Sequence, residues 1–293
     1  TEQTYPNIEL LVMDDASTDD SVAQIEAFLS GCPLPHRFFP LPENQGNCAA
    51  FNYAFRHSQG EFIVDLATDD LLHPERIARQ VSAFQNLDQR YGVVFSDVEY
   101  IDAEGAFLKT HYQRDAKGNL LESVPSGDLF TRLLRPGGFI SVTSQMTRRS
   151  VLEDLGGFDE NLAYEDYDFW LRSSRKYHYF FQDKVLTKKR VLKDSLGQQF
   201  YRPRTEKMLR STLVVCRKAQ ALIQNNEEKA ALLASVRYHL RQAVLTENFS
   251  VAQGFGKLRK ELTDSSFQDH FWDTLAKQKI PLNWAYRVWA KLF

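Results

Sequence analysis

Two pairs of aspartates occupy matching places in the chain, because each pair comes directly after a short apolar segment. Asp14 and Asp15 follow the first such segment, and Asp69 and Asp70 follow another. Short, continuous apolar runs are typical of strands that are covered on both faces in a parallel sheet. The carboxyl ends of such strands form the edge where open α/β sheets bind ligands. The four carboxylates are therefore predicted to belong to one ligand site.

Carboxylates gathered at one edge repel one another unless a cation or hydrogen-bond donors offset their charge. A divalent cation with oxygen ligands is the natural partner, and a diphosphate would complete its coordination. The alternative is that each pair caps the N-terminus of the helix that follows it. One cap needs only one aspartate, so the presence of two pairs favours the ligand site.

A third acidic group lies further along, where Glu165 and Asp166 begin a pattern of helical spacing over 166–172. Phe169 and Trp170 are expected to face the core from this helix. Carboxylates at a helix start are favoured by the helix dipole, so a simple cap is one interpretation. The other is a general base that removes a proton from an acceptor hydroxyl. The spacing alone does not separate the two.

The elements that position these residues alternate between strands and helices. Strands are expected over 8–13, 38–39, 62–66, 92–101, 139–147 and, as a pair, over 177–192. Helices are expected over 22–29, 48–57, 74–84 and 149–155. This alternation predicts a doubly wound, mostly parallel, Rossmann-like α/β sheet over residues 1–200. From about residue 200 the apolar spacing becomes helical, which predicts two helices and a helical module over 201–293.

The composition excludes several classes of protein. The 293 residues include 36 Lys and Arg against 38 Asp and Glu, a net charge of −2, so a nucleic-acid partner is not expected. A hydrophobic content of 43% is too high for a disordered chain. No run reaches the ~20 apolar residues that a membrane-spanning helix needs. Three cysteines without paired spacing are typical of reduced thiols in a cytoplasmic protein.

Four segments resemble, in the same order, the motifs of family 2 glycosyltransferases, a large group of inverting enzymes of GT-A type. They are QTYPNIELLVMDDASTDDS at 3–21, ENQGNCAAFN at 43–52, GEFIVDLATDDLLHP at 60–74, and GFDE with EDYDFWLR within 157–172. Any one of these motifs is a weak signal, but four in order make a specific resemblance. The resemblance implies a nucleotide-sugar donor, most typically a UDP-sugar, and a saccharide or lipid-linked acceptor hydroxyl.

The resemblance also implies a role for each acidic residue on the donor side. Asp15, with Asp14 beside it, stands where the family contacts the nucleotide base. Asp69 and Asp70 stand at the family's DXD metal motif. Asp70 is the expected direct ligand of Mn²⁺ or Mg²⁺, with Asp69 beside it facing the ribose and the sugar. The cation would offset the charge that builds on the departing diphosphate.

On the acceptor side, Asp166 stands at the family's catalytic base, and Glu165 lies next to it. Three positions depart from the family's pattern. Ala67 replaces the first aspartate of the usual DADD string, and Phe51 replaces an arginine that reaches the diphosphate. Leu192 replaces a histidine that can reach the metal. A metal would then depend on the aspartates, phosphate and water.

The family's opening strand and helix have no counterpart ahead of residue 3, so we expect roughly 30–40 preceding residues in the native protein. Two other functions are compatible with the motifs: a nucleotidyltransferase on a related fold, and a non-catalytic module that binds nucleotide-sugars. The end of the chain, 284–293, mixes aromatic and basic residues. It is expected either to pack on the helical module or to touch a membrane surface, which places the protein in the cytoplasm or at the inner face of the cell membrane.

Overall fold

The structure is a computed structural model of the 293-residue chain, and it describes residues 2–192, 195–264, 266–284 and 286. The chain divides into two compact units. One, here called the sheet unit, contains the residues up to Leu129 together with Ile140–Leu192. The other, the helical unit, contains Phe130–Phe139 and the residues from 193 onward. The division of function between residues 1–200 and 201–293 stays a prediction.

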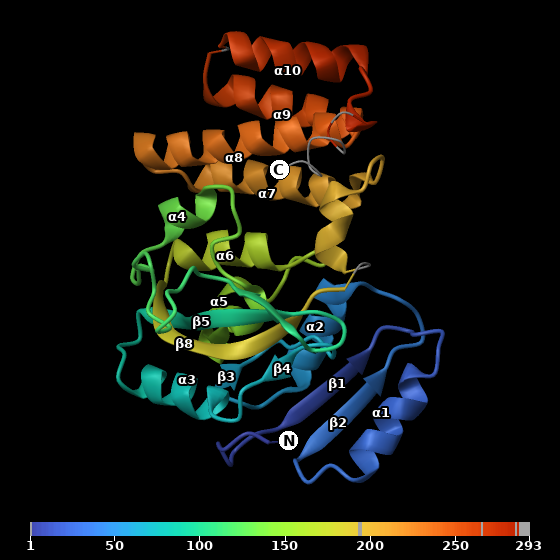
Figure 1. The fold of residues 1–293 in the computed structure, drawn as a ribbon, viewed down its shortest axis with the longest axis vertical. Coiled ribbons are helices and arrows are strands. Elements are labelled where there is room, and N and C mark those ends of the chain that lie inside the picture. Colours follow the sequence, from blue (N-terminus) through green and yellow to red (C-terminus); the bar gives the residue numbers. More distant parts are fainter. Residues whose placement is uncertain (1, 193–194, 265, 285, 287–293) are drawn as a thin grey trace. The chain divides into compact units, whose positions relative to one another are not determined.

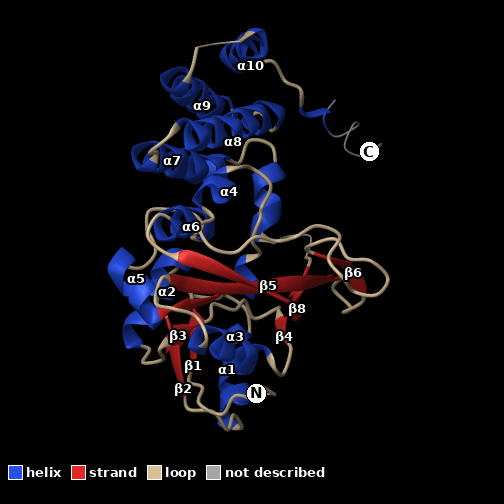
Figure 2. Ribbon diagram, turned by 90° about the vertical axis from the view of Figure 1, so that its left-hand side faces the viewer, coloured by secondary structure: helices blue, strands red, loops and turns tan. Residues whose placement is uncertain are grey.

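The sheet unit contains eight strands among its described residues, with the helices between them (Figures 1 and 2). The strands are β1 (Leu10–Asp14), β2 (His36–Pro40), β3 (Phe62–Ile63), β4 (Leu71–Leu72), β5 (Tyr91–Ile101), β6 (Phe107–Thr110), β7 (Met146–Arg148) and β8 (His178–Arg190). The helices are α1 (Ser21–Ser30), α2 (Asn47–His57), α3 (Arg76–Gln85), α5 (Arg149–Leu155) and α6 (Asp166–Ser174), with a short 3₁₀ helix at Val142–Ser144.

These strands form two sheets. β1 and β2 pair in parallel, and the six-stranded sheet has the order β3-β7-β5-β8-β4, with β6 also paired to β5. The two longest pairings, β1 with β2 and β5 with β8, are parallel, whereas the short β3, β4, β6 and β7 pair antiparallel to their neighbours. Helix α3 covers one face of the larger sheet, and α5 and α6 lie on the other (Figures 1 and 2). The predicted α/β fold class is confirmed.

The core of the sheet unit forms around β5. Val93, Val94 and Phe95 are fully buried, because this continuous apolar run is covered on both faces. Val81 and Phe84 of α3 pack against Val94 from one side. The parallel β5 and β8 therefore form the centre of the larger sheet.

Several predicted strands have different bounds in the structure. The strand predicted over 62–66 is only the two-residue β3, so Asp69 and Asp70 do not directly follow a strand. The strand pair predicted over 177–192 is wrong, because β8 is a single strand. Its register shifts opposite Asp97, where the exposed Asp183 and Lys184 interrupt the apolar pattern and imitate a turn. The strand predicted over 139–147 is instead the short β7, which a 3₁₀ helix precedes.

The helical unit contains four long helices in its described residues, twice the number that the spacing predicted. They are α7 (Glu206–Leu222), α8 (Asn226–Leu245), α9 (Phe249–Leu262) and α10 (Phe267–Gln278), accompanied by the short α4 (Phe130–Leu134) and a 3₁₀ helix at Leu196–Tyr201. Consecutive long helices pack against each other, and α4 packs on α8. Among the helices that the structure describes, none combines the length and the apolar composition of a membrane span.

Candidate functional site

Asp14 ends β1 and turns its side chain back onto the following loop. Its Oδ2 accepts a hydrogen bond of 3.0 Å from the backbone N–H of Ser17, and the residue is only 5% exposed. Helix α1 begins later, after Asp20 as its N-cap residue. Asp14 therefore stabilises a turn beside the site and does not cap the helix, which removes one alternative that the sequence left open.

Asp15 holds the turn that leads into α2. Its two carboxylate oxygens accept hydrogen bonds from the backbone N–H groups of Gln45, at 2.7 Å, and Gly46, at 2.8 Å. The amide of Asn44 donates to the backbone oxygen of Asp15 at 3.0 Å. Gly46 has a φ of +90°, which side chains disfavour, so a glycine suits this turn. The first and second family motifs are thus joined through Asp15.

Asp69 and Asp70 lie in the turn between β3 and β4, and the end of β8 holds them there. The backbone N–H of Arg190 donates to Oδ1 of Asp70 at 2.9 Å, and its Nε donates to the backbone oxygen of Asp69 at 3.2 Å. Asp70 is 6% exposed. Helix α3 begins several residues later with Glu75 as its N-cap, so this pair is not a helix cap either.

The charges around Asp70 do not balance. Burial raises the pKa of Asp70, and Asp69 raises it further, while the Arg190 N–H, Lys189 and Arg76 lower it. Arg76 is fully buried, donates to Oγ1 of Thr187 at 2.8 Å, and has its own pKa lowered to about 9 by burial. The net effect leaves Asp70 short of positive charge, so a bound cation would stabilise its ionised form.

The oxygen ligands that this turn offers suit a metal ion that also binds phosphate. Asp69 and Asp70 offer carboxylate oxygens, which hard divalent cations prefer. In the described part of the chain, however, no three His, Cys, Asp or Glu side chains converge so that they could hold a metal ion. The protein would therefore supply part of the coordination shell, with phosphate oxygens and water as the remainder.

Glu165 and Asp166 lie together at the start of α6, as predicted. Glu165 is 8% exposed and accepts a hydrogen bond of 2.6 Å from Nδ2 of Asn47. Burial raises the pKa of Glu165. Burial, with the neighbouring Glu165, raises the pKa of Asp166 to about 7, although its Oδ1 accepts from the N–H of Tyr167. A carboxylate that titrates near neutral pH is suited to general base catalysis.

Asp65 is a further acidic residue of this site that the sequence analysis did not select. Burial raises its pKa to about 7, with a further contribution from Glu165, so the two carboxylates lie near each other. Asp65 lines a small cavity together with Gln145 and Phe158. The signal that was available is an acidic residue inside the apolar run of 62–66. Such a residue is costly in a buried strand and is more frequent at functional positions.

Lys189, near the end of β8, acts on both the DXD aspartates and the predicted base. Its positive charge lowers the pKa of Asp70, of Glu165 and of Asp166. One cation acts on all three carboxylates, so the structure brings the metal motif and the predicted base into one electrostatic site. The sequence places these groups more than 90 positions apart.

Asn52 joins the second motif to the fourth. Its Oδ1 accepts from the N–H of Phe158 at 2.9 Å, and its Nδ2 donates to the oxygen of Phe158 at 2.8 Å and to Oε1 of Glu160 at 2.9 Å. Gly157 has a φ of +79°, and a Cβ there would lie 2.5 Å from Oδ1 of Asn52. Phe51, which replaces the family's arginine, stacks on Phe158 with ring centres 4.1 Å apart.

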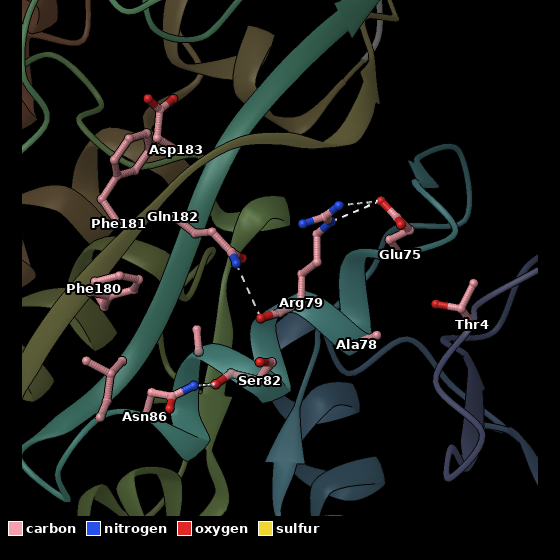
Figure 3. Close-up of a pocket in the computed structure, with 12 residues that line it drawn as sticks. Thr4, Glu75, Ala78, Arg79, Ser82, Asn86, Phe180, Phe181, Gln182 and Asp183 are labelled. Atoms are coloured by element: carbon pink, nitrogen blue, oxygen red, sulfur yellow. Dashed lines mark hydrogen bonds and ion pairs between the residues drawn. The ribbon is translucent and has the colours of Figure 1, made fainter.

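A hollow of about 920 Å³ lies away from these carboxylates, between α3 and the first half of β8 (Figure 3). An ion pair between Arg79 and Glu75 and the side chain of Gln182, which donates to the Arg79 backbone oxygen, lie along it. None of the predicted site residues lines this hollow. The candidate site is therefore formed by the carboxylates and not by this larger hollow.

Comparisons with known proteins agree with the motifs. Residues 1–156 match the family described as Glycosyl transferase family 2. An uncharacterized glycosyltransferase of Rickettsia conorii is 31% identical over 189 residues, which cover 64% of this chain and 30% of that protein. One of Rickettsia typhi is 32% identical over 193 residues, which cover 64% of this chain and 56% of that protein. The chain thus spans about a third to just over half of these relatives.

Two solved structures share the fold. S. aureus TarS 1–349 in complex with UDP-GlcNAc has a TM-score of 0.63 at 17% identity, covering 98% of this chain and 85% of that one. The mannosyltransferase PcManGT from Pyrobaculum calidifontis, in complex with GDP-Man and Mn²⁺, has a TM-score of 0.57 at 17% identity, covering 99% and 81%. The predicted family and the predicted GT-A-type fold are confirmed.

Proposed function

Because the chain belongs to glycosyl transferase family 2, we propose that it transfers a sugar from a nucleoside-diphosphate donor to an acceptor hydroxyl with inversion. A UDP-sugar is the proposed donor, and TarS, which shares the fold, was solved with UDP-GlcNAc. A saccharide or a lipid-linked saccharide is the proposed acceptor, so the reaction belongs to polysaccharide assembly. We place it in the cytoplasm or at the inner face of the cell membrane, with residues 1–200 as the catalytic domain.

The observation that carries the proposal is the position of Asp166 at the start of α6, beside the Glu165 that Asn47 holds, where burial and Glu165 raise the pKa of Asp166 to about 7. At neutral pH a large fraction of Asp166 is ionised and can accept the proton of the acceptor hydroxyl. The hydroxyl oxygen then forms a bond to the anomeric carbon while the bond from that carbon to the diphosphate oxygen breaks. The electron pair leaves with the diphosphate and the proton stays on Asp166. Attack opposite the leaving group inverts the configuration.

The donor is held by the acidic residues of the first and third motifs in this proposal. Asp14 and Asp15 lie on the nucleotide side, and Asp15 positions the turn at Gly46 beside it. Asp69 and Asp70 would hold Mn²⁺ or Mg²⁺, which supplies positive charge to the departing diphosphate. Glu165, held by Asn47, lies on the acceptor side and raises the pKa of the base.

A non-catalytic module that binds nucleotide-sugars is the second candidate, and one observation favours it. Phe51 packs its ring on Phe158, so this position offers the diphosphate no charge. A nucleotidyltransferase is the third, but such an enzyme has no use for a base at the start of α6. Transfer of a sugar to any acceptor would exclude the non-catalytic binding module.

The test combines donor binding with turnover. Thermal-shift measurements with UDP-sugars, with and without Mn²⁺, identify the donor, and release of UDP measures turnover with candidate saccharide acceptors. Asp166→Asn should retain donor binding and lose turnover. Glu104→Gln, an exposed change in the same unit, is the matched control and should retain both. Turnover by Asp166→Asn at the wild-type rate would contradict the proposal.

A further inference from the structure

The charge of the chain is divided unevenly between its two units. The helical unit carries 19 Lys and Arg against 9 Asp and Glu, which gives a formal charge of +10. The sheet unit carries 17 against 29, which gives −12. The net charge of −2 conceals this difference. A strongly basic unit attracts anionic surfaces over several ångströms, whatever the charge of the rest of the chain.

Helix α10 of this basic unit presents two exposed phenylalanines. Phe267 is 89% exposed and Phe271 is 52% exposed. They are four positions apart, so both lie on the same face of the helix. Leu275 and Ala276, nearer the end of the helix, are buried, and α10 packs against α9. The two exposed phenylalanines are therefore not needed for the packing of α10 within its unit.

The acidic residues of α10 do not lie on this exposed face. Asp269 is buried, and the guanidinium of Arg237 donates to it at 2.7 and 2.9 Å. Asp273 accepts from Nη2 of Arg259 at 2.9 Å. The exposed residues beyond the phenylalanines include Lys277 and Lys279. Exposed apolar and basic side chains without carboxylates form the surface that interfacial helices present to anionic lipid.

We propose that α10 docks the protein on an anionic lipid surface. Phe267 and Phe271 enter the boundary between headgroups and acyl chains, and Lys277 and Lys279 contact the lipid phosphates. The choice of a membrane over an anionic polymer follows from the phenyl rings, which offer hydrogen-bonded polymers no donor or acceptor and gain from hydrocarbon. This docking deepens the proposed function, since it would bring the enzyme to a lipid-linked acceptor.

The experiment is co-sedimentation of the full chain with phosphatidylcholine vesicles that contain about 30% phosphatidylglycerol or none, at low and high salt. We expect binding to the anionic vesicles only, weakened by salt. The double variant Phe267→Ser/Phe271→Ser should bind about tenfold or more weakly, and so should Lys277→Glu/Lys279→Glu. The matched control is Phe107→Ser/Leu108→Ser, which removes two exposed apolar side chains from β6 of the acidic unit and should leave binding unchanged. Circular dichroism checks that each variant is folded.

Equal binding to both kinds of vesicle, or unchanged binding by the two α10 variants, would overturn the proposal. Self-association of the chain that the α10 variants abolish, without vesicle binding, would assign the surface to a second copy instead. Vesicle binding does not depend on a donor or an acceptor. A failure of the glycosyltransferase proposal would therefore leave this result unaffected, and the two can be distinguished.

Discussion

Nδ2 of Asn47 donates a hydrogen bond of 2.6 Å to Oε2 of Glu165, although 118 positions separate the two residues in the chain. Asn47 directly follows the turn that Asp15 holds through Gly46. Through this chain of contacts the proposed nucleotide side of the site is connected to the carboxylates at the start of α6. A substitution on one side of the site should therefore affect the carboxylates on the other side.

Asn47→Ala should lower kcat/KM by roughly tenfold, the loss expected when a hydrogen bond to a charged group is removed. The bond from Asn47 lowers the pKa of Glu165, so its removal leaves Glu165 less ionised. Glu165 then raises the pKa of Asp166 less, and the acidic limb of the pH–rate profile should move to lower pH. Steady-state kinetics between pH 5 and 8 checks both effects. Asn44→Ala, in the same loop, is the control and should leave the pH profile in place. An unchanged profile in Asn47→Ala would separate Glu165 from the chemistry.

Asp166→Asn should lower kcat by a factor of roughly 10² to 10⁴, the usual contribution of one general base. The affinity for UDP with Mn²⁺ should remain, because Asn keeps the shape of the side chain. Calorimetric titration measures the affinity and UDP release measures the rate. Near-normal turnover with the true acceptor would transfer the role to another carboxylate, and Glu165 is the first to test.

The same variant should change the dependence of stability on pH. Asp166 has a pKa of about 7 in the folded protein against 3.8 as its ordinary value, so folding becomes less favourable as pH rises between these two values. Asn cannot ionise, so the stability of the variant does not fall in this way as the pH rises. Without donor or metal, Asp166→Asn should therefore melt a few degrees above the wild type at pH 8 and at the same temperature near pH 4. Equal melting temperatures at both pH values would show that the pKa of Asp166 is not raised in the folded protein.

Asp70→Asn should abolish the part of UDP affinity that depends on Mn²⁺, because it removes a charged ligand from a site with few others. Calorimetry with and without Mn²⁺ measures that part directly. Asp65→Asn is the comparison, since Asp65 lies in the same segment but belongs to the carboxylates around Glu165. It should leave the Mn²⁺ dependence intact. The assignment of the metal motif is wrong if Asp70→Asn binds Mn²⁺ and UDP as the wild type does.

Lys189→Met should weaken donor binding and raise the apparent pKa of the base, because Lys189 lowers the pKa of Asp70, Glu165 and Asp166 together. Lys189→Arg keeps the charge and should restore most of the wild-type pH–rate profile. A purely structural role for Lys189 would change the melting temperature in both variants without moving the profile.

The positions of the acidic residues at the ends of elements could be predicted from the sequence, because motif and apolar pattern are both local. β5 and the start of α6 can be predicted for the same reason. The contacts that give these residues their chemistry are not local. Lys189 and Asp65 acquire their importance from Asp166 and Glu165, which come from distant segments, and no spacing rule connects them. The strand pair predicted over 177–192 is wrong because Asp183 and Lys184 resemble a turn in the sequence, whereas in the structure they form an irregularity within one continuous strand.

The close contact between Gly157 and Asn52 can be tested by adding a Cβ at Gly157. Gly157→Ala introduces a residue at a φ of +79° and a Cβ 2.5 Å from Oδ1 of Asn52, which must then give up its hydrogen bonds to Phe158. The combined cost should be about 2–5 kcal/mol of the free energy of unfolding. Gly156→Ala is the matched control, because its φ is +71° but nothing lies within 4 Å of the added Cβ, so only the backbone cost of about 1–2 kcal/mol is expected. In an Asn52→Ala background, Gly157→Ala should cost no more than this control. Chemical denaturation of the four variants measures these differences, and equal costs for the two glycines in the wild-type background would mean that Asn52 does not lie against Gly157.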